Sequence, residues 1–72
     1  HELNIDVELG QSEGVTINIY NLIGELMVTN SYEMSKGINT IKLDIEGLKD
    51  GVYLCKVNSG NNQMTRKFNV LK

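Results

Sequence analysis

Apolar and polar residues alternate strictly along much of this chain, which is the pattern of a strand with one buried face. In the opening segment the apolar positions are Leu3, Ile5, Val7 and Leu9, each separated from the next by a polar residue. Successive side chains of a strand point to opposite faces, so this spacing gathers the apolar side chains on one face. No segment repeats apolar residues at the spacing of a helix face. The alternation therefore indicates an all-β fold.

The alternation recurs between short turn sequences and predicts six strands. They cover residues 3–9, 15–21, 26–32, a segment with the apolar face Ile41, Leu43 and Ile45, residues 52–58 and residues 63–71. In the last strand Met64, Phe68 and Val70 share one face. No connection is long enough to cross between parallel strands, which favours antiparallel pairing. We therefore expect a small antiparallel immunoglobulin-like β-sandwich of six to seven strands.

Glycines mark several of the predicted turns. Gly24, in the hairpin turn between the second and third strands, is the natural position for a positive φ angle, which glycine adopts without strain. Gly37 precedes the fourth strand. A tight connection over residues 46–51 follows that strand, and we expect Leu48 to return into the core there.

The chain has 72 residues, no proline and one cysteine. A domain of this size buries only about 60% of the surface that its unfolded chain exposes, which leaves little room for a deep enzyme pocket. Cys55 has no second cysteine with which to form an internal disulfide, so we expect packing alone to stabilise the domain. The chain begins at His1 rather than Met, and we expect it to be a piece of a longer protein.

Charge is distributed unevenly along the chain. Residues 1–35 carry six acids and no Lys or Arg, whereas residues 36–72 carry all seven bases and three acids, giving −6 and +4. Either the two halves pair across a sheet, or the basic end has a function of its own. The bases Lys42, Lys56 and Lys67 lie on predicted strands, where we expect them to protect sheet edges from pairing with other chains.

The side chains needed for catalysis or metal binding are nearly absent. His1 is the only histidine, so general-base, triad and histidine-ligand sites lack their central residue. The acidic pairs Asp6 with Glu8 and Asp44 with Glu46 are too few for calcium, which takes about six to eight oxygen ligands. Phosphate-binding glycine loops and bases interleaved with exposed aromatics are also missing. We expect no enzyme activity, cofactor, metal, small-molecule substrate or nucleic-acid partner.

Tyr53 follows the Asp50-Gly51 turn and precedes Cys55 by two residues. This arrangement resembles the tyrosine corner of immunoglobulin-like sandwiches, in which the ring enters the core and the hydroxyl bonds a backbone group upstream. Cys55 has no flanking histidine or helix N-terminus that would lower the thiol pKa, so we interpret it as a small buried apolar residue.

Three segments together carry a family resemblance. They are IYNLIGELMV at residues 19–28, LDIEGLKDGVYLCKV at residues 43–57 and the basic ending TRKFNVLK at residues 65–72. In their order and spacing they resemble the type A C-terminal sorting domain of proteins exported by the type IX (Por) secretion system of Gram-negative bacteria. Ile45 stands where that family has a serine. The family's short proline-containing opening is absent, so we expect residues 1–72 to be a single sorting domain that lacks its first few residues.

The resemblance implies a domain joined to the C-terminus of a larger cargo protein. In the family, the cargo crosses the inner membrane into the periplasm, and the outer-membrane translocon then recognises the domain. A sortase-like cysteine protease commonly removes the domain and attaches the cargo to lipopolysaccharide at the cell surface. As an isolated fragment, such a domain is also a candidate for a strand-swapped dimer.

With this resemblance, the basic end is a candidate for the surface that the translocon recognises; the alternative is a solvated edge strand. Its candidate residues are Arg66, Lys67, Phe68, Val70 and Lys72. We assign Gly24, Gly51 and Tyr53 to the fold. The alternative is an immunoglobulin- or fibronectin-like accessory module that binds carbohydrate or protein, for which Tyr20 and Tyr32 are the available aromatic residues.

Overall fold

The computed structural model describes residues 2–71, which form six strands and the turns between them. The strands are β1 Glu2–Leu9, β2 Glu13–Asn21, β3 Leu26–Met34, β4 Gly37–Asp44, β5 Gly51–Ser59 and β6 Asn62–Val70. All six predicted strands are confirmed, although Ile45 lies just past the end of β4 rather than within it. No segment among these residues is a helix that could cross a membrane.

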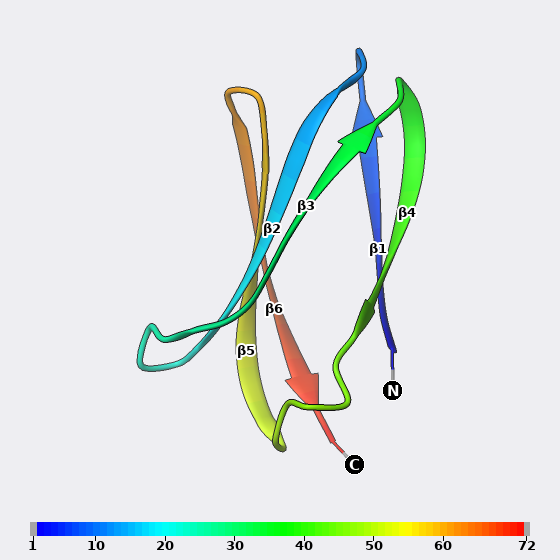
Figure 1. Ribbon diagram of the computed structural model, residues 1–72. Helices are drawn as coiled ribbons and strands as arrows, with labels where there is room; N and C mark the ends of the chain where they lie inside the picture. Colours follow the sequence, from blue (N-terminus) through cyan, green and yellow to red (C-terminus); the bar gives the residue numbers. More distant parts are fainter. Residues whose placement is uncertain (1, 72) are drawn as a thin grey trace.

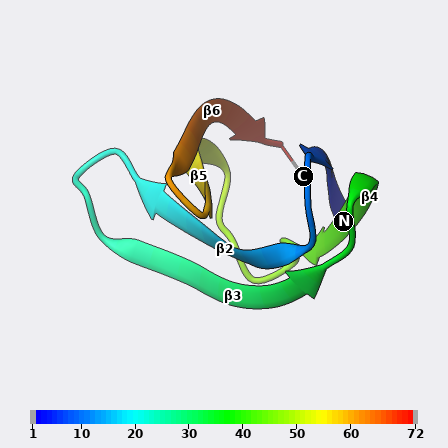
Figure 2. The same ribbon diagram turned by 90° about the horizontal axis from the view of Figure 1, so that it is seen from above.

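The strands form two sheets that face each other across the core (Figures 1 and 2). One sheet has two strands in the order β1-β4, and the other has four in the order β3-β2-β5-β6. Every neighbouring pair is antiparallel. The predicted antiparallel sandwich is therefore confirmed, but one of its sheets has only half as many strands as the other.

The core is built from the alternating apolar positions of the sequence. Its most deeply buried side chains are Val15, Ile17 and Ile19 on β2, together with Leu43 on β4. They pack with inward-facing residues of β1 and β5. Leu48 is buried as predicted, and its backbone N–H donates to the carbonyl of Ile45, 3.0 Å away.

The turn between β2 and β3 is held by one side chain. The Asn21 Oδ1 atom accepts hydrogen bonds from the backbone N–H groups of Ile23 and Glu25, at 3.1 and 2.9 Å. Gly24 has φ +89°, so its predicted positive φ is confirmed. Leu22 and Ile23 remain exposed at the tip of this turn.

Two of the three strand lysines lie on sheet edges, as predicted, and the third does not. Lys42 is on β4 and Lys67 is on β6, and both strands have a free edge. Lys56 is on β5, which pairs with β2 on one side and with β6 on the other, so the edge prediction is wrong for this residue. Its ammonium instead lies 5.4 Å from the centre of the Tyr20 ring, a cation–π contact.

Truncating the centre of β2 should destabilise the domain strongly. Ile17 is 0% exposed, so Ile17→Ala should lower the free energy of unfolding by about 2–5 kcal/mol, through lost burial and the cavity left behind. Ile38 is 74% exposed, and the control Ile38→Ala should change stability by less than about 0.5 kcal/mol. Urea denaturation of both variants measures the difference; equal effects would contradict this core assignment.

Candidate functional site

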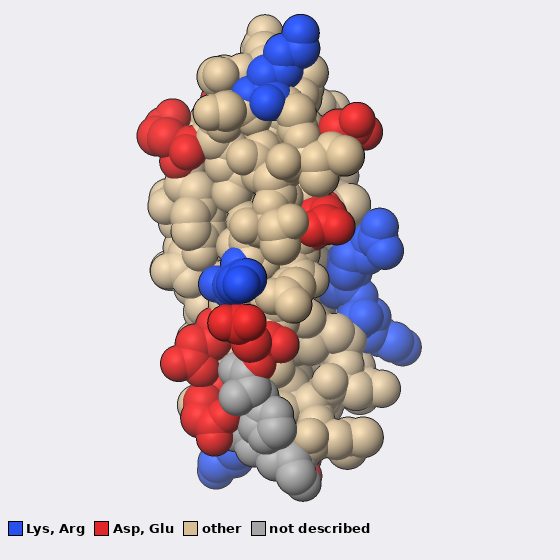
Figure 3. Space-filling view, turned by 90° about the vertical axis from the view of Figure 1, so that its right-hand side faces the viewer, with Lys and Arg blue, Asp and Glu red and all other residues tan. Residues whose placement is uncertain are grey.

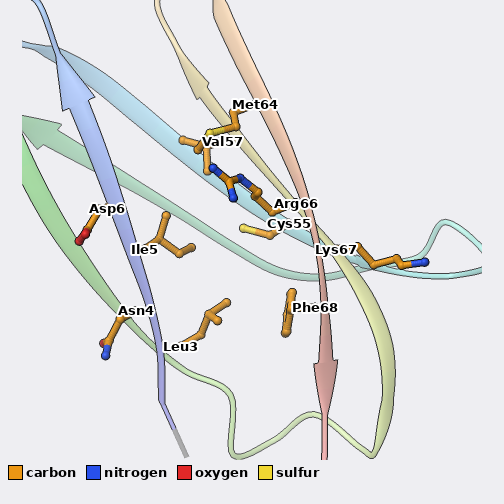
Figure 4. Close-up of a pocket in the computed structure, with 10 residues that line it drawn as sticks. All are labelled: Leu3, Asn4, Ile5, Asp6, Cys55, Val57, Met64, Arg66, Lys67 and Phe68. Carbon is orange, nitrogen blue, oxygen red and sulfur yellow. The ribbon is translucent and has the colours of Figure 1, made fainter.

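The strand β6 contains four of the five predicted recognition residues, and it directs them to two different faces. Lys67 points away from the sandwich, whereas Arg66 and Phe68 point into the space between the sheets (Figure 4). Val70 also faces inward and is 2% exposed. The fifth residue, Lys72, lies outside the described residues. The structure therefore does not bring the predicted set together on one surface.

Arg66 occupies an inward position on an otherwise apolar strand face. It lies between Met64 and Phe68 in the alternation of β6 and pairs in register with Cys55 on β5. Within residues 2–71 its guanidinium makes no hydrogen bond or ion pair. The residue stays exposed because the sheet opposite does not extend over it.

A groove separates β1 from β6 along much of their length. One part of it has a volume of about 340 Å³ and is lined by β1, β5 and β6, with Cys55 and Val57 at its base. A second part of about 380 Å³ continues along the same three strands and shares Asp6, Val57 and Met64 with the first. Leu3 and Ile5 of β1 face Met64 and Phe68 across the first part (Figure 4). These four residues, with Cys55 and Val57 beneath them, make the first part largely apolar.

The sequence did not predict this groove, but it contained one signal. The positions Met64, Arg66, Phe68 and Val70 follow a single period-two face, so a base interrupts an apolar face. Arg66 and Lys67 were grouped as one basic ending, although adjacent residues of a strand point in opposite directions. The groove exists because the two sheets have different numbers of strands. The alternation pattern does not encode which strands pair, so it could not predict this difference.

Phe68 and Val70 mainly hold β6 in place. The Phe68 ring stacks on the Tyr53 ring, with centroids 5.7 Å apart and an interplanar angle of 26°. Val70 belongs to the buried core and pairs in register with Gly51. These two residues therefore fix the end of β6 against β5 and orient the exposed bases beside them.

The tyrosine corner is confirmed. The Tyr53 hydroxyl donates a hydrogen bond to the backbone carbonyl of Lys49, 2.6 Å away, and its ring is buried. Gly51 has φ +155°, a backbone angle that residues with a Cβ atom rarely adopt. Together Gly51 and Tyr53 fix the connection from β4 into β5, as assigned from the sequence.

The other residues considered for chemistry are buried or make hydrogen bonds within the fold. Cys55 is 2% exposed, and burial raises the pKa of its thiol above the ordinary value. The Asp6 carboxylate accepts a hydrogen bond from Thr40, and that of Asp44 accepts one from the backbone N–H of Glu46. In the part of the chain that the structure describes, no group of three or more His, Cys, Asp or Glu side chains is placed to hold a metal ion.

The aromatic residues available for sugar binding do not share a face. Tyr32 pairs in register with the buried Val15 and packs against the core. Tyr20 is next to the buried Ile19 in β2, so it points to the outer face, where Lys56 covers its ring. A flat carbohydrate platform needs coplanar rings on one surface, and these two rings lie on opposite faces of the sheet.

On the face shown in Figure 3, acidic and basic side chains both occur, and one basic side chain lies directly against the acidic group near the lower end. Neither sign covers this face alone. The strand bases also do not pair with acids across the sheets, since Lys42, Lys56 and Lys67 lie opposite Asn4, Asn18 and Leu54. Directly opposed cross-strand ion pairs therefore do not explain why these bases lie in the second half of the chain.

Fold and surface together define the class of protein, which is a small all-β module. Its distinguishing feature is a free strand edge beside a groove into which the basic side chain of Arg66 points. The model of the family described as "Secretion system C-terminal sorting domain" matches residues 1–71, and the chain belongs to this family, which serves type IX secretion. Searches of curated proteins and of solved structures gave no match. Membership implies a cargo protein linked on the N-terminal side, recognition by secretion machinery and a cargo that is secreted or held at the cell surface. A sorting domain of this family is not itself an enzyme.

Two substitutions of Tyr53 should separate the contribution of its ring to stability from that of its hydroxyl. Tyr53→Phe removes only the hydrogen bond to Lys49 and should destabilise the domain by about 0.5–1.5 kcal/mol. Tyr53→Ala also removes a buried ring that stacks on Phe68 and should cost about 3 kcal/mol or more. Thermal and urea unfolding measure both variants. If Tyr53→Ala kept the wild-type melting temperature, the corner would not stabilise the fold.

The thiol of Cys55 should react slowly while the domain is folded. Burial limits access and raises the thiol pKa, so less thiolate is present at pH 8 than in an unfolded chain. Because the folded-state pKa is the higher one, the stability that this group contributes is present below the unfolded-state pKa and is lost as pH rises through the folded-state pKa. Iodoacetamide labelling followed by mass spectrometry should therefore be slow in buffer and fast in concentrated urea. Equal rates would contradict the burial.

Proposed function

We propose that this domain carries an N-terminally linked cargo from the periplasm across the outer membrane, by binding to the outer-membrane translocon of the type IX system. A sortase then removes the domain and attaches the cargo to lipopolysaccharide at the cell surface. The observation that carries this proposal is the family match over residues 1–71, which covers all six strands and all but the last residue of the basic ending. We further propose that residues 1–72 form one self-contained sorting domain.

Within the proposed recognition surface, the structure supports different roles for the exposed bases and for the inward-facing apolar residues. Arg66 and Lys67 are exposed and make no polar contact within residues 2–71, so their charges are available to a partner. Phe68 and Val70 pack inward and hold the strand that presents those charges. The edge of β6 opposite β5 is unpaired, and a free edge can accept a further strand. We assign Lys72 to the same surface on the basis of the sequence alone.

Removing both exposed bases of β6 should reduce export without unfolding the domain. The domain is fused to the C-terminus of an inert periplasmic reporter, in a host that has the secretion system. Arg66→Gln with Lys67→Gln should lower the reporter outside the outer membrane about tenfold, the change expected for a loss of about 1.4 kcal/mol of binding. The matched control is Lys42→Gln on the free edge of β4, which should export normally.

Three results are distinguishable in this experiment. If the wild-type fusion stays in the periplasm, the proposed sorting function of the domain is wrong. If the wild-type fusion and the double variant are exported equally, sorting stands but recognition through the β6 bases is wrong. If the purified double variant has a lower thermal midpoint than wild type, its export defect comes from reduced stability and not from lost recognition. Truncation before Leu71 leaves the buried Val70 in place and tests the chain end separately.

A further inference from the structure

The unequal sheets leave one inner surface of the sandwich uncovered. The sheet β1-β4 has two strands and lies opposite a sheet of four, so the inner face of β6 extends past the edge of β1, whereas the inward residues of β5 are buried. Met64 and Phe68 are consequently only partly buried, although both pack against the core. The groove along β1 and β6 is therefore a place where the sandwich lacks a covering strand.

The backbone of β1 offers a place for that strand to pair. Among residues 2–71, β1 pairs only with β4, so its other edge carries unpaired N–H and C=O groups that face the groove. A strand added there would lie about 4.8 Å from β1 in its own sheet and about 10 Å above the inner face of β6. At that separation inward side chains of the added strand interdigitate with those of β6.

The groove also specifies what the added strand must present. Arg66 extends into it beside Met64, Cys55 and Phe68 (Figure 4). Asn4, Asp6 and Lys67 also line its first part, but their side chains point away from it. A strand that covered the guanidinium with apolar atoms alone would leave a buried unpaired charge, which is strongly unfavourable. A carboxylate opposite Arg66 would instead form a charge-assisted, bidentate hydrogen bond. The complementary pattern is an acidic residue with an apolar residue two positions before and two positions after it.

We propose that the groove between β1 and β6 binds an extended segment of a partner protein, which pairs with the free edge of β1 and places a carboxylate on Arg66 and apolar side chains on Met64 and Phe68. This inference rests on the proposed function in one respect: the partner is then a component of the secretion machinery. A second copy of the chain fits poorly. In none of its strands is an acid flanked by apolar residues two positions away on both sides.

The test uses the purified domain and a synthetic peptide in which valine alternates with threonine and glutamate replaces the central valine. Nuclear magnetic resonance titration should shift the amide signals of β1, β5 and β6 that border the groove. A peptide with glutamine at the centre should bind about tenfold more weakly, since it loses the ionic part of the contact. A peptide with N-methyl groups on one edge should not bind, because it cannot pair with β1.

Two variants of adjacent residues on β6 supply the matched control. Arg66→Gln should remove the preference for glutamate over glutamine, whereas Lys67→Gln, whose side chain points to the other face, should keep it. Both changes replace an exposed base on the same strand, so a difference between them cannot come from net charge. Urea unfolding of both variants should give stabilities close to wild type.

Several outcomes would overturn the inference. These are no perturbation at millimolar peptide, equal binding of the glutamate and glutamine peptides, and shifts confined to the outer face of β6. Concentration-dependent self-association through the groove residues, without peptide, would assign the groove to a dimer instead. Peptide binding with normal preference in a domain that fails to export its reporter would leave the groove assignment intact and refute only the sorting function.

Discussion

The burial of the inward faces of β2 and β5 beneath a sheet of only two strands is the constraint on which the rest of this structure depends. Ile17, Ile19 and Cys55 are completely or almost completely buried because they pack in one core with the inward-facing residues of β1 and β4. The same two strands are too few to reach over β6. One packing arrangement therefore produces both the well-covered centre of the core and the half-covered groove beside it.

The sequence predicted most of the fold because alternation is a local property. Leu3, Ile5 and Val7 identify a half-buried strand without any knowledge of its neighbours, and the same holds for the other strands. Gly24 and Tyr53 were assigned correctly for a related reason, since their constraints act within a single turn or corner. The order of strands within a sheet is a non-local property. Alternation gives the buried face of a strand but not its partners, which is why Lys56 was wrongly placed on an edge.

The residues that identify the family and the residues proposed to meet a partner are largely different. Gly51 and Tyr53 belong to the most recognisable motif of the sequence, and in the structure they fix the corner that leads into β5. Asn21 and Gly24, in another of the motifs, hold the β2–β3 turn. Residues that hold a turn or a corner serve the fold and do not specify what the fold binds. Membership in the family therefore shows the kind of domain, and the location of its contact surface has to be argued from exposed side chains.

Among the exposed side chains Arg66 does most to specify a contact surface, because its inward position is unfavourable for an ordinary core. A leucine at this site would leave no charge on the inward face of β6, and the uncovered edge of β1 would then accept almost any apolar strand, including one from a misfolded neighbour. An inward-pointing charge prevents such pairing, since an apolar strand cannot cover it without leaving it unpaired. The same charge admits a strand that brings a carboxylate. A single residue can thus protect the free edge from unspecific association and select a partner, and both effects depend on Arg66 facing inward while Lys67 faces out.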